Sequence, residues 1–274
     1  WYAEHGITLH LGKRVVDVNR SRRTVTADDG TEAPYDRLLI ATGSNPFIPP
    51  LPGKDLQGVI AYRDIKDTNE MIATAQTHKH AVVVGGGLLG LEAANGLMLR
   101  GMSVTVVHLA PWLMERQLDD VAGRMLQKSL EARGLKFRIG AQTQALIGDA
   151  DDGRSGRVKA LRFTDGTEEP ADLVVMAAGI RPNTELAERI GLHCNRGIVV
   201  NDTMQTITDA RIYSIGECAA HRGIAYGLVA PLFEQAKVCA NHLAEFGIGR
   251  YLGSQTSTKL KVTGIDLFSA GNFT

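Results

Sequence analysis

The middle of the chain alternates short apolar runs with longer amphipathic segments. The run Ala81–Val84 predicts a strand, and a glycine-rich turn then leads into the helical pattern Leu88–Arg100. The order repeats with a strand at Ser103–Leu109, a helix at Asp119–Arg133 and a strand at Leu135–Ile139. Strands that alternate with helices at this length predict a parallel, doubly wound sheet.

Shorter segments flank this region on both sides. We expect strands at Ile7–Leu11, Arg14–Asn19 and Thr24–Ala27, a hairpin turn at Asp28–Gly30, a buried strand at Tyr35–Ala41, an extended linker at Pro46–Pro52 and a helix at Asp64–Gln76. Later segments predict a small antiparallel meander at Thr143–Gly148, Arg157–Phe163 and Thr167–Glu169, buried strands at Asp172–Ala177 and Ile212–Ile215, and a helix near Glu234–Glu245.

Composition and charge exclude several classes of function. The 274 residues carry 30 basic and 30 acidic side chains, which argues against a nucleic-acid-binding surface or a polybasic membrane patch. Apolar runs fall well short of the roughly 20 residues that cross a bilayer, and the first residues do not resemble a signal peptide, so we expect a cytoplasmic protein. The three cysteines form no C-x-x-C or C-x4-C pair, which predicts reduced thiols and no metal site.

A glycine fingerprint carries the clearest chemistry. Gly85, Gly87 and Gly90 have the G-x-G-x-x-G spacing between a predicted strand and a predicted helix. In this motif the first glycine permits a tight turn, the second lets the backbone approach a pyrophosphate, and the third lets helix and strand pack closely. Glu92 lies just inside the helix, where it is either a carboxylate favoured by the helix N-terminus or a polar contact to a nicotinamide.

The second strand ends at His108, where a fingerprint of this kind usually has an acidic residue for the ribose. A neutral imidazole can hydrogen-bond a ribose hydroxyl, whereas a protonated one could meet a 2′-phosphate. The first basic side chain downstream is Arg116, so we favour NADH over NADPH. The alternative is a surface histidine at a strand end.

Four motifs in order then reveal a family resemblance. They are YDRLLIATGS at Tyr35–Ser44, VVVGGGLLGLEAA at Val82–Ala94, AAGIRPNTELA at Ala177–Ala187 and IYSIGECAA at Ile212–Ala220. Their order resembles the FAD-dependent pyridine nucleotide-disulfide oxidoreductases over nearly the whole chain. The resemblance implies an α/β fold with two Rossmann-like dinucleotide-binding domains and small antiparallel β meanders. The NAD(P)H domain would be inserted in the FAD domain.

The resemblance also implies site residues, although it assigns no catalytic side chain. For NAD(P)H they are Gly85, Gly87, Leu88, Leu89, Gly90, Glu92, His108, Gly179 and Ile180. For FAD they are Ala41, Thr42, Gly43, Arg63, Gly216, Glu217, Leu232 and Phe233, with Glu217 standing where the family usually has Asp. The alternative role for Leu232 and Phe233 is core packing.

The C-terminal part of the sequence indicates a more specific resemblance within this family. Glu217–Leu243 and Thr258–Phe273 resemble the flavoprotein part of the large subunit in the assimilatory NAD(P)H-nitrite reductases. That likeness implies hydride transfer from NAD(P)H to FAD and electron flow onward to a metal centre. In the parent enzyme nitrite would be reduced to ammonium at a sirohaem linked to an iron–sulfur cluster, both outside this chain.

The chain has no second G-x-G-x-x-G before Ala41, so we expect an incomplete FAD domain. The expected domains are 1–79 and 197–250 for FAD, 80–196 for NAD(P)H, and 251–274 as the start of a C-terminal domain. Expected partners are NAD(P)H and a downstream redox centre or small subunit, and the chain could also form a homodimer. Two alternatives stay open: an NADH-dependent rubredoxin- or ferredoxin-type reductase, and an NAD(H)-binding module without turnover.

Overall fold

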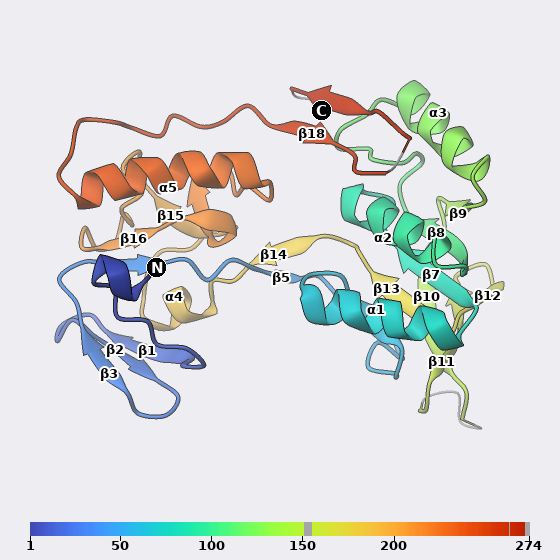
Figure 1. Cartoon of the computed structure of the whole chain (residues 1–274), viewed down its shortest axis with the longest axis horizontal. Coiled ribbons are helices and arrows are strands. Elements are labelled where there is room, and N and C mark those ends of the chain that lie inside the picture. The colour runs from blue at the N-terminus through green and yellow to red at the C-terminus, as the bar shows by residue number, and fades with distance from the viewer. Residues whose placement is uncertain (151–154, 263, 272–274) are drawn as a thin grey trace. The chain divides into compact units, whose positions relative to one another are not determined.

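The computed structural model describes residues 1–150, 155–262 and 264–271, which form two compact units (Figure 1). Unit 1 comprises Trp1–Ser44 and Pro182–Ser254, and unit 2 comprises Asn45–Arg181 and Gln255–Thr274. The units therefore divide at 44/45, 181/182 and 254/255, whereas the sequence suggested 79/80, 196/197 and 250/251. Within the described residues, no helix has the length and apolar character needed to cross a membrane.

Unit 2 is built on a five-stranded sheet whose strands are all parallel, as predicted. Its order is β6–β13–β7–β8–β9, with bounds β6 Val59–Ala61, β7 His80–Val84, β8 Ser103–His108, β9 Lys136–Ile139 and β13 Leu173–Met176. The edge strand β6 was not predicted, because three residues are too few to show a periodicity. Its pairing with β13 explains why the chain before residue 80 belongs to this unit.

Helices cover one face of this sheet: α1 Ile65–Thr77, α2 Leu88–Met98 and α3 Asp120–Glu131 (Figure 1). Asp64 accepts a hydrogen bond from the backbone of Asp67 in a capping box, and Asp119 caps α3 by accepting a single hydrogen bond from the backbone N–H of Ala122. These caps satisfy backbone N–H groups that the first helical turn leaves unpaired. Alternate strand residues such as Val83 then pack against the helices.

The opposite face is covered by the antiparallel meander β10 Thr143–Gly148, β11 Val158–Phe163 and β12 Glu168–Pro170. Val82 and Val174, which point away from the helices, pack here with Leu161 and Phe163. The helices α1 to α3 thus pack on one face of the sheet, and the antiparallel meander predicted from the sequence covers the other. Both layers are apolar because a central parallel strand buries both of its faces. The strands β18 Ser257–Lys259 and β19 Phe268–Ala270 complete the unit as a hairpin.

Unit 1 combines an antiparallel sheet with two pairs of parallel strands. The sheet comprises β1 Val15–Asn19, β2 Thr24–Ala27 and β3 Glu32–Pro34, as the hairpin signal predicted. The parallel pairs are β4 Leu38–Ile40 with β16 Ile212–Ser214, and β15 Ile198–Val200 with β17 Ala219–His221. Its helices are η1 Ala3–His5, α4 Glu185–Arg189, η2 Gly216–Cys218 and α5 Val229–Leu243. The chain passes between the units in β5 Ser44–Pro46 and β14 Ile180–Pro182.

Three local predictions in unit 1 need correction. The segment Ile7–Leu11 forms no strand, because no described segment pairs with it. The expected strand Tyr35–Ala41 shortens to β4, and Leu39 is 40% exposed rather than buried. Helix α5 begins at Val229, five residues before the expected start, because Pro231 lies in the first turn where no backbone N–H is needed.

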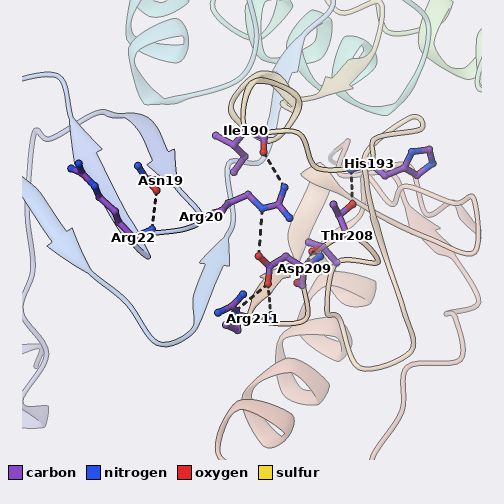
Figure 2. Close-up of polar contacts among 9 residues, drawn as sticks. Asn19, Arg20, Arg22, Ile190, His193, Thr208, Asp209 and Arg211 are labelled. Carbon is purple, nitrogen blue, oxygen red and sulfur yellow. Dashed lines mark hydrogen bonds and ion pairs between the residues drawn. The ribbon is translucent and has the colours of Figure 1, made fainter.

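A charged cluster fastens the β1–β2 turn to the rest of unit 1 (Figure 2). The guanidinium of Arg20 donates to the Asp209 carboxylate at 3.4 Å and to the carbonyl of Ile190 at 3.3 Å. Asp209 is only 9% exposed and also accepts from the backbone of Arg211 at 3.0 Å. Burial alone would raise the pKa of the Asp209 carboxyl, but hydrogen bonds from Arg211 and Arg20 outweigh it and leave that pKa below its usual range.

We predict that Asp209→Asn lowers the free energy of unfolding by about 2 kcal/mol at pH 7, because it weakens a mostly buried ion pair. A lowered folded-state pKa stabilises the fold above the unfolded-state value of about 3.9, and this contribution disappears as the pH falls through the folded-state pKa. Urea unfolding followed by circular dichroism should therefore show a gap between the two proteins that closes below about pH 4.

The matched control is Asp36→Asn, which removes an exposed carboxylate paired with Arg23 at 3.5 Å. It should unfold close to the wild-type midpoint, since exposed ion pairs contribute little. Equal midpoints for wild type and Asp209→Asn at pH 7 would contradict the assigned role of the cluster.

Candidate functional site

The glycine-rich turn after β7 is tightly packed backbone. A Cβ atom on Gly85 would lie 2.2 Å from the carbonyl oxygen of Ala177, and Gly85 has a φ of +128°. A Cβ atom on Gly90 would lie 1.9 Å from the carbonyl oxygen of Gly85. Both positions therefore exclude side chains, and α2 sits directly against β7 and the end of β13.

The middle glycine of the fingerprint is different. A Cβ atom on Gly87 would meet nothing within 4 Å, and its φ of −85° is open to any residue. Gly87 is the N-cap of α2, where no side chain caps the helix and no acidic residue occupies the first turn. An uncapped helix N-terminus beside open space favours an anion, because N–H groups and the helix dipole both face it.

A cavity of about 940 Å³ opens at this point, wholly within unit 2. This volume lies in the upper part of the usual range for ligand pockets. Of the predicted NAD(P)H residues, those in its wall are Gly85, Gly87, Leu88, His108, Gly179 and Ile180. Leu89, Gly90 and Glu92 are not in the wall, and the Glu92 carboxylate accepts from the backbone of Lys261 at 3.1 Å.

The cavity lies where the strand order of the sheet reverses. From β7, the next strand along the chain, β8, pairs on one side, and β13 pairs on the other after a long crossover. The wall includes the residues that follow all three strands. In open parallel sheets, ligands bind outside the carboxyl ends of the strands at such a reversal.

His108 lies at the end of β8 with an exposed fraction of 8%, so the surface-histidine alternative was wrong. Its Nδ1 accepts from the backbone N–H of Gly86 at 3.0 Å. The neutral ring therefore carries its proton on Nε2, which donates to Glu115 Oε2 at 3.0 Å. Sequence reasoning missed Glu115 because it lies seven residues beyond the strand end.

Sequence reasoning also missed a stacked pair in the cavity wall. The Arg181 guanidinium lies 4.2 Å from the centre of the Phe47 ring, and both side chains belong to the cavity wall. The backbone N–H of Phe47 donates to the carbonyl of Gly179 at 2.9 Å. Phe47 lies within the predicted linker Pro46–Pro52, whose prolines suggested only an extended connection.

In unit 1 the structure brings most of the predicted FAD residues to one sheet edge. Ala41–Gly43 follow β4 and Gly216–Glu217 follow β16, and these strands pair in parallel. Gly43 and Gly216 both have positive φ angles, +66° and +85°. The Ser44 hydroxyl donates to the Glu217 carboxylate at 2.7 Å.

Neighbouring groups hold this edge in place. Thr42 donates its hydroxyl to the carbonyl of Asn183 at 2.7 Å, and the side chain of buried Gln235 on α5 accepts from the backbone N–H of Gly216 at 3.0 Å. Leu232 packs against a core cluster of unit 1, which agrees with the core alternative, whereas Phe233 is 72% exposed. Arg63 lies in unit 2, just before α1.

The three cysteines are free thiols in unit 1. Burial raises the pKa of the Cys194 thiol and of the Cys239 thiol to about 11 each. A thiol with such a pKa is almost fully protonated at neutral pH and is a poor nucleophile. Cys218 is fully buried and lies near Ser214 and backbone carbonyls. This geometry does not suit a reactive dithiol.

Known proteins resemble the chain over its whole length. It is 55% identical over 273 residues to a nitrite reductase [NAD(P)H] of Bacillus subtilis, and the match covers 100% of this chain and 33% of that protein. It is 46% identical to an assimilatory nitrate reductase electron transfer subunit of the same organism, covering 99% of this chain and 34% of that protein. The chain thus spans about a third of the length of these relatives.

The fold agrees with these relationships. A solved structure of a ferredoxin reductase for the CYP199A2 system from Rhodopseudomonas palustris superposes with a TM-score of 0.91 at 27% identity. The superposition covers 99% of this chain and 66% of that one. The two Rossmann-like units and the antiparallel meanders are therefore confirmed as a fold of FAD- and NAD(P)-binding reductases.

The family profile of the pyridine nucleotide-disulphide oxidoreductases matches residues 2–242. The chain belongs to this family, and it is an oxidoreductase of the type that uses FAD and NAD(P)H.

Proposed function

We propose that this chain is a flavoprotein reductase segment in which unit 2 binds NAD(P)H and unit 1 binds FAD. The main support for this proposal is the space beside the Gly87 backbone. Gly87 is the N-cap of α2, where no side chain caps the helix, and it lies in the wall of a large cavity where the strand order reverses. When both are bound, the nicotinamide supplies a hydride that the flavin accepts and passes on as single electrons.

The side chains and backbone of this protein would bind and orient the cofactors. The N–H groups at the start of α2 would hold the pyrophosphate of NAD(P)H. Gly179, Ile180 and the Phe47–Arg181 pair would form a further part of the cavity wall around the dinucleotide. In unit 1, Ala41–Gly43 and Gly216–Glu217 would offer backbone and carboxylate contacts to FAD. The remaining proposed FAD contacts are Arg63, Leu232 and Phe233.

The electrons would continue to a metal centre rather than to a disulfide of this chain. Burial raises the pKa of the Cys194 and Cys239 thiols to about 11, which makes them poor candidates for the reactive dithiol that disulfide reduction needs. The likeness to nitrite reductases supports a parent protein that reduces nitrite to ammonium, with the sirohaem and iron–sulfur cluster beyond this chain. A downstream redox centre or small subunit would then be the electron-accepting partner.

A second candidate is an NADH-dependent reductase of a separate carrier such as a rubredoxin or ferredoxin. The close superposition on a ferredoxin reductase supports it. A module that binds NAD(H) without turnover is a third candidate, from a different class. The dinucleotide cavity has the same role in all three, so flavin turnover and the acceptor distinguish them.

We predict that Gly87→Val weakens NADH binding at least about tenfold, because the new side chain occupies the approach of the pyrophosphate. Thermal stability should stay near wild type, since the Cβ position is open and the backbone conformation is ordinary. Isothermal titration calorimetry measures the affinity, and differential scanning calorimetry measures the stability.

Gly96→Val is the matched control for this change. Gly96 also has open space around its Cβ position, but it lies within α2 and outside the cavity wall. It should bind NADH as wild type does. Equal NADH affinity in Gly87→Val and Gly96→Val would reject the fingerprint as the pyrophosphate site.

We further predict that the protein carrying this chain, loaded with FAD, reduces ferricyanide with NADH. Stopped-flow absorbance should show bleaching of the flavin band by NADH, followed by reoxidation on adding ferricyanide. Flavin that stays oxidised after NADH binds would favour the binding module. Turnover with an added rubredoxin or ferredoxin but not with nitrite would favour the carrier reductase.

A further inference from the structure

We propose that Glu115 takes the place of the missing strand-end acid and makes the site select NADH over NADPH, with His108 as its positioning residue. This inference rests on the proposed function, because it assigns the specificity of the same cavity. Glu115 would accept hydrogen bonds from the hydroxyls of the adenosine ribose and repel a 2′-phosphate.

The location of the pair fits this role. In Rossmann-type domains the residue about 20 positions after the fingerprint, at the end of the second strand, contacts the adenosine ribose. His108 is 21 residues beyond Gly87 and ends β8, the second strand from the fingerprint. The Glu115 carboxylate reaches this point from the following loop, 3.0 Å from the His108 ring, and belongs to the cavity wall.

The His108 imidazole is held in place and cannot rotate freely toward a ligand. A Cβ atom on Gly86 would lie 2.8 Å from His108 Cγ, so the glycine backbone packs closely on the ring. The Gly86 N–H occupies Nδ1, which leaves the proton on Nε2 facing Glu115. His108 is thus held by the fingerprint turn and presents one donor to one carboxylate oxygen.

The loop that carries Glu115 is fastened to the same turn. Met114, the preceding residue, is fully buried and donates its backbone N–H to the carbonyl of Gly86 at 3.0 Å. Its φ of +54° is uncommon for a residue with a side chain, and the adjacent Leu113 is also fully buried. The position of Glu115 at the cavity is therefore fixed by the packing of the residues that precede it.

The charge of the pair decides between the two dinucleotides. The Glu115 side chain is 35% exposed, so one carboxylate oxygen can bind His108 while the group still faces the cavity. A carboxylate accepts from ribose hydroxyls and repels the roughly two negative charges of a 2′-phosphate. Arg116, also in the cavity wall, is the competing group because a guanidinium would attract that phosphate.

The test compares NADH and NADPH binding to the FAD-loaded protein by calorimetry, in wild type and in Glu115→Gln. We expect wild type to prefer NADH, and Glu115→Gln to reduce the NADH-to-NADPH affinity ratio about tenfold or more. The carboxamide keeps the size of the side chain but removes the charge. Glu131→Gln makes the same change at the end of α3, outside the cavity wall, and should leave the ratio unchanged.

Two His108 variants test the positioning role. His108→Gln keeps an N–H donor and should retain most of the preference, whereas His108→Leu should lose part of it while the FAD content stays the same. A merely structural role would lower both affinities together and leave the ratio constant.

The possible outcomes distinguish a failure of the proposed function from a failure of the proposed role of Glu115. Binding of neither dinucleotide by wild type overturns the proposed function and this inference together. Tight NADH binding with the same ratio in wild type and Glu115→Gln overturns this inference alone. A wild-type preference for NADPH that disappears in Arg116→Ala would also overturn it and assign the choice to Arg116.

Discussion

The contact between the backbones of Gly85 and Gly90 is the constraint on which unit 2 depends. Because no Cβ fits at either glycine, α2 can start directly above β7 and beside the end of β13. That closeness points the first N–H groups of α2 at open space beside Gly87. The proposed anion site therefore follows from the packing of backbone, and it needs no charged side chain.

The layers that cover the two faces of the sheet limit where a ligand can bind. Alternate residues of β7 and β13 face the helices on one side and the meander β10–β12 on the other, so the sheet is buried on both faces. Only the strand ends remain for a ligand. Since β8 and β13 leave β7 on opposite sides, their following loops splay apart and the cavity forms between them.

Unit 1 uses the same arrangement on a smaller scale. A glycine with positive φ follows each of the paired strands β4 and β16, and the Ser44–Glu217 hydrogen bond joins the two turns. Cys218 lies beside these turns, where its buried thiol donates to the carbonyls of Ile40 and Ile215, whereas burial raises the pKa of the Cys239 thiol to about 11 and keeps it protonated at neutral pH. The chain matches about a third of the length of a nitrite reductase, and this match supports the proposal that electrons would pass beyond this segment.

The sequence alone predicted three features of the fold: the fingerprint turn, the parallel strands β7 to β9 and the meander. Tight turns, buried apolar runs and amphipathic periods are local properties, so they can be read from neighbouring residues. Four ordered motifs likewise determined the family. The tertiary structure decided what depends on distant residues: the edge strand β6, the wall formed by Phe47 and Arg181, and the absence of a strand at Ile7–Leu11. It also decided the contacts of His108, whose sequence context left ribose, phosphate and surface contacts open. Burial of His108 against Gly86 and its hydrogen bond to Glu115 depend on how the fingerprint turn, the end of β8 and the following loop pack together, and no periodic sequence pattern encodes that packing.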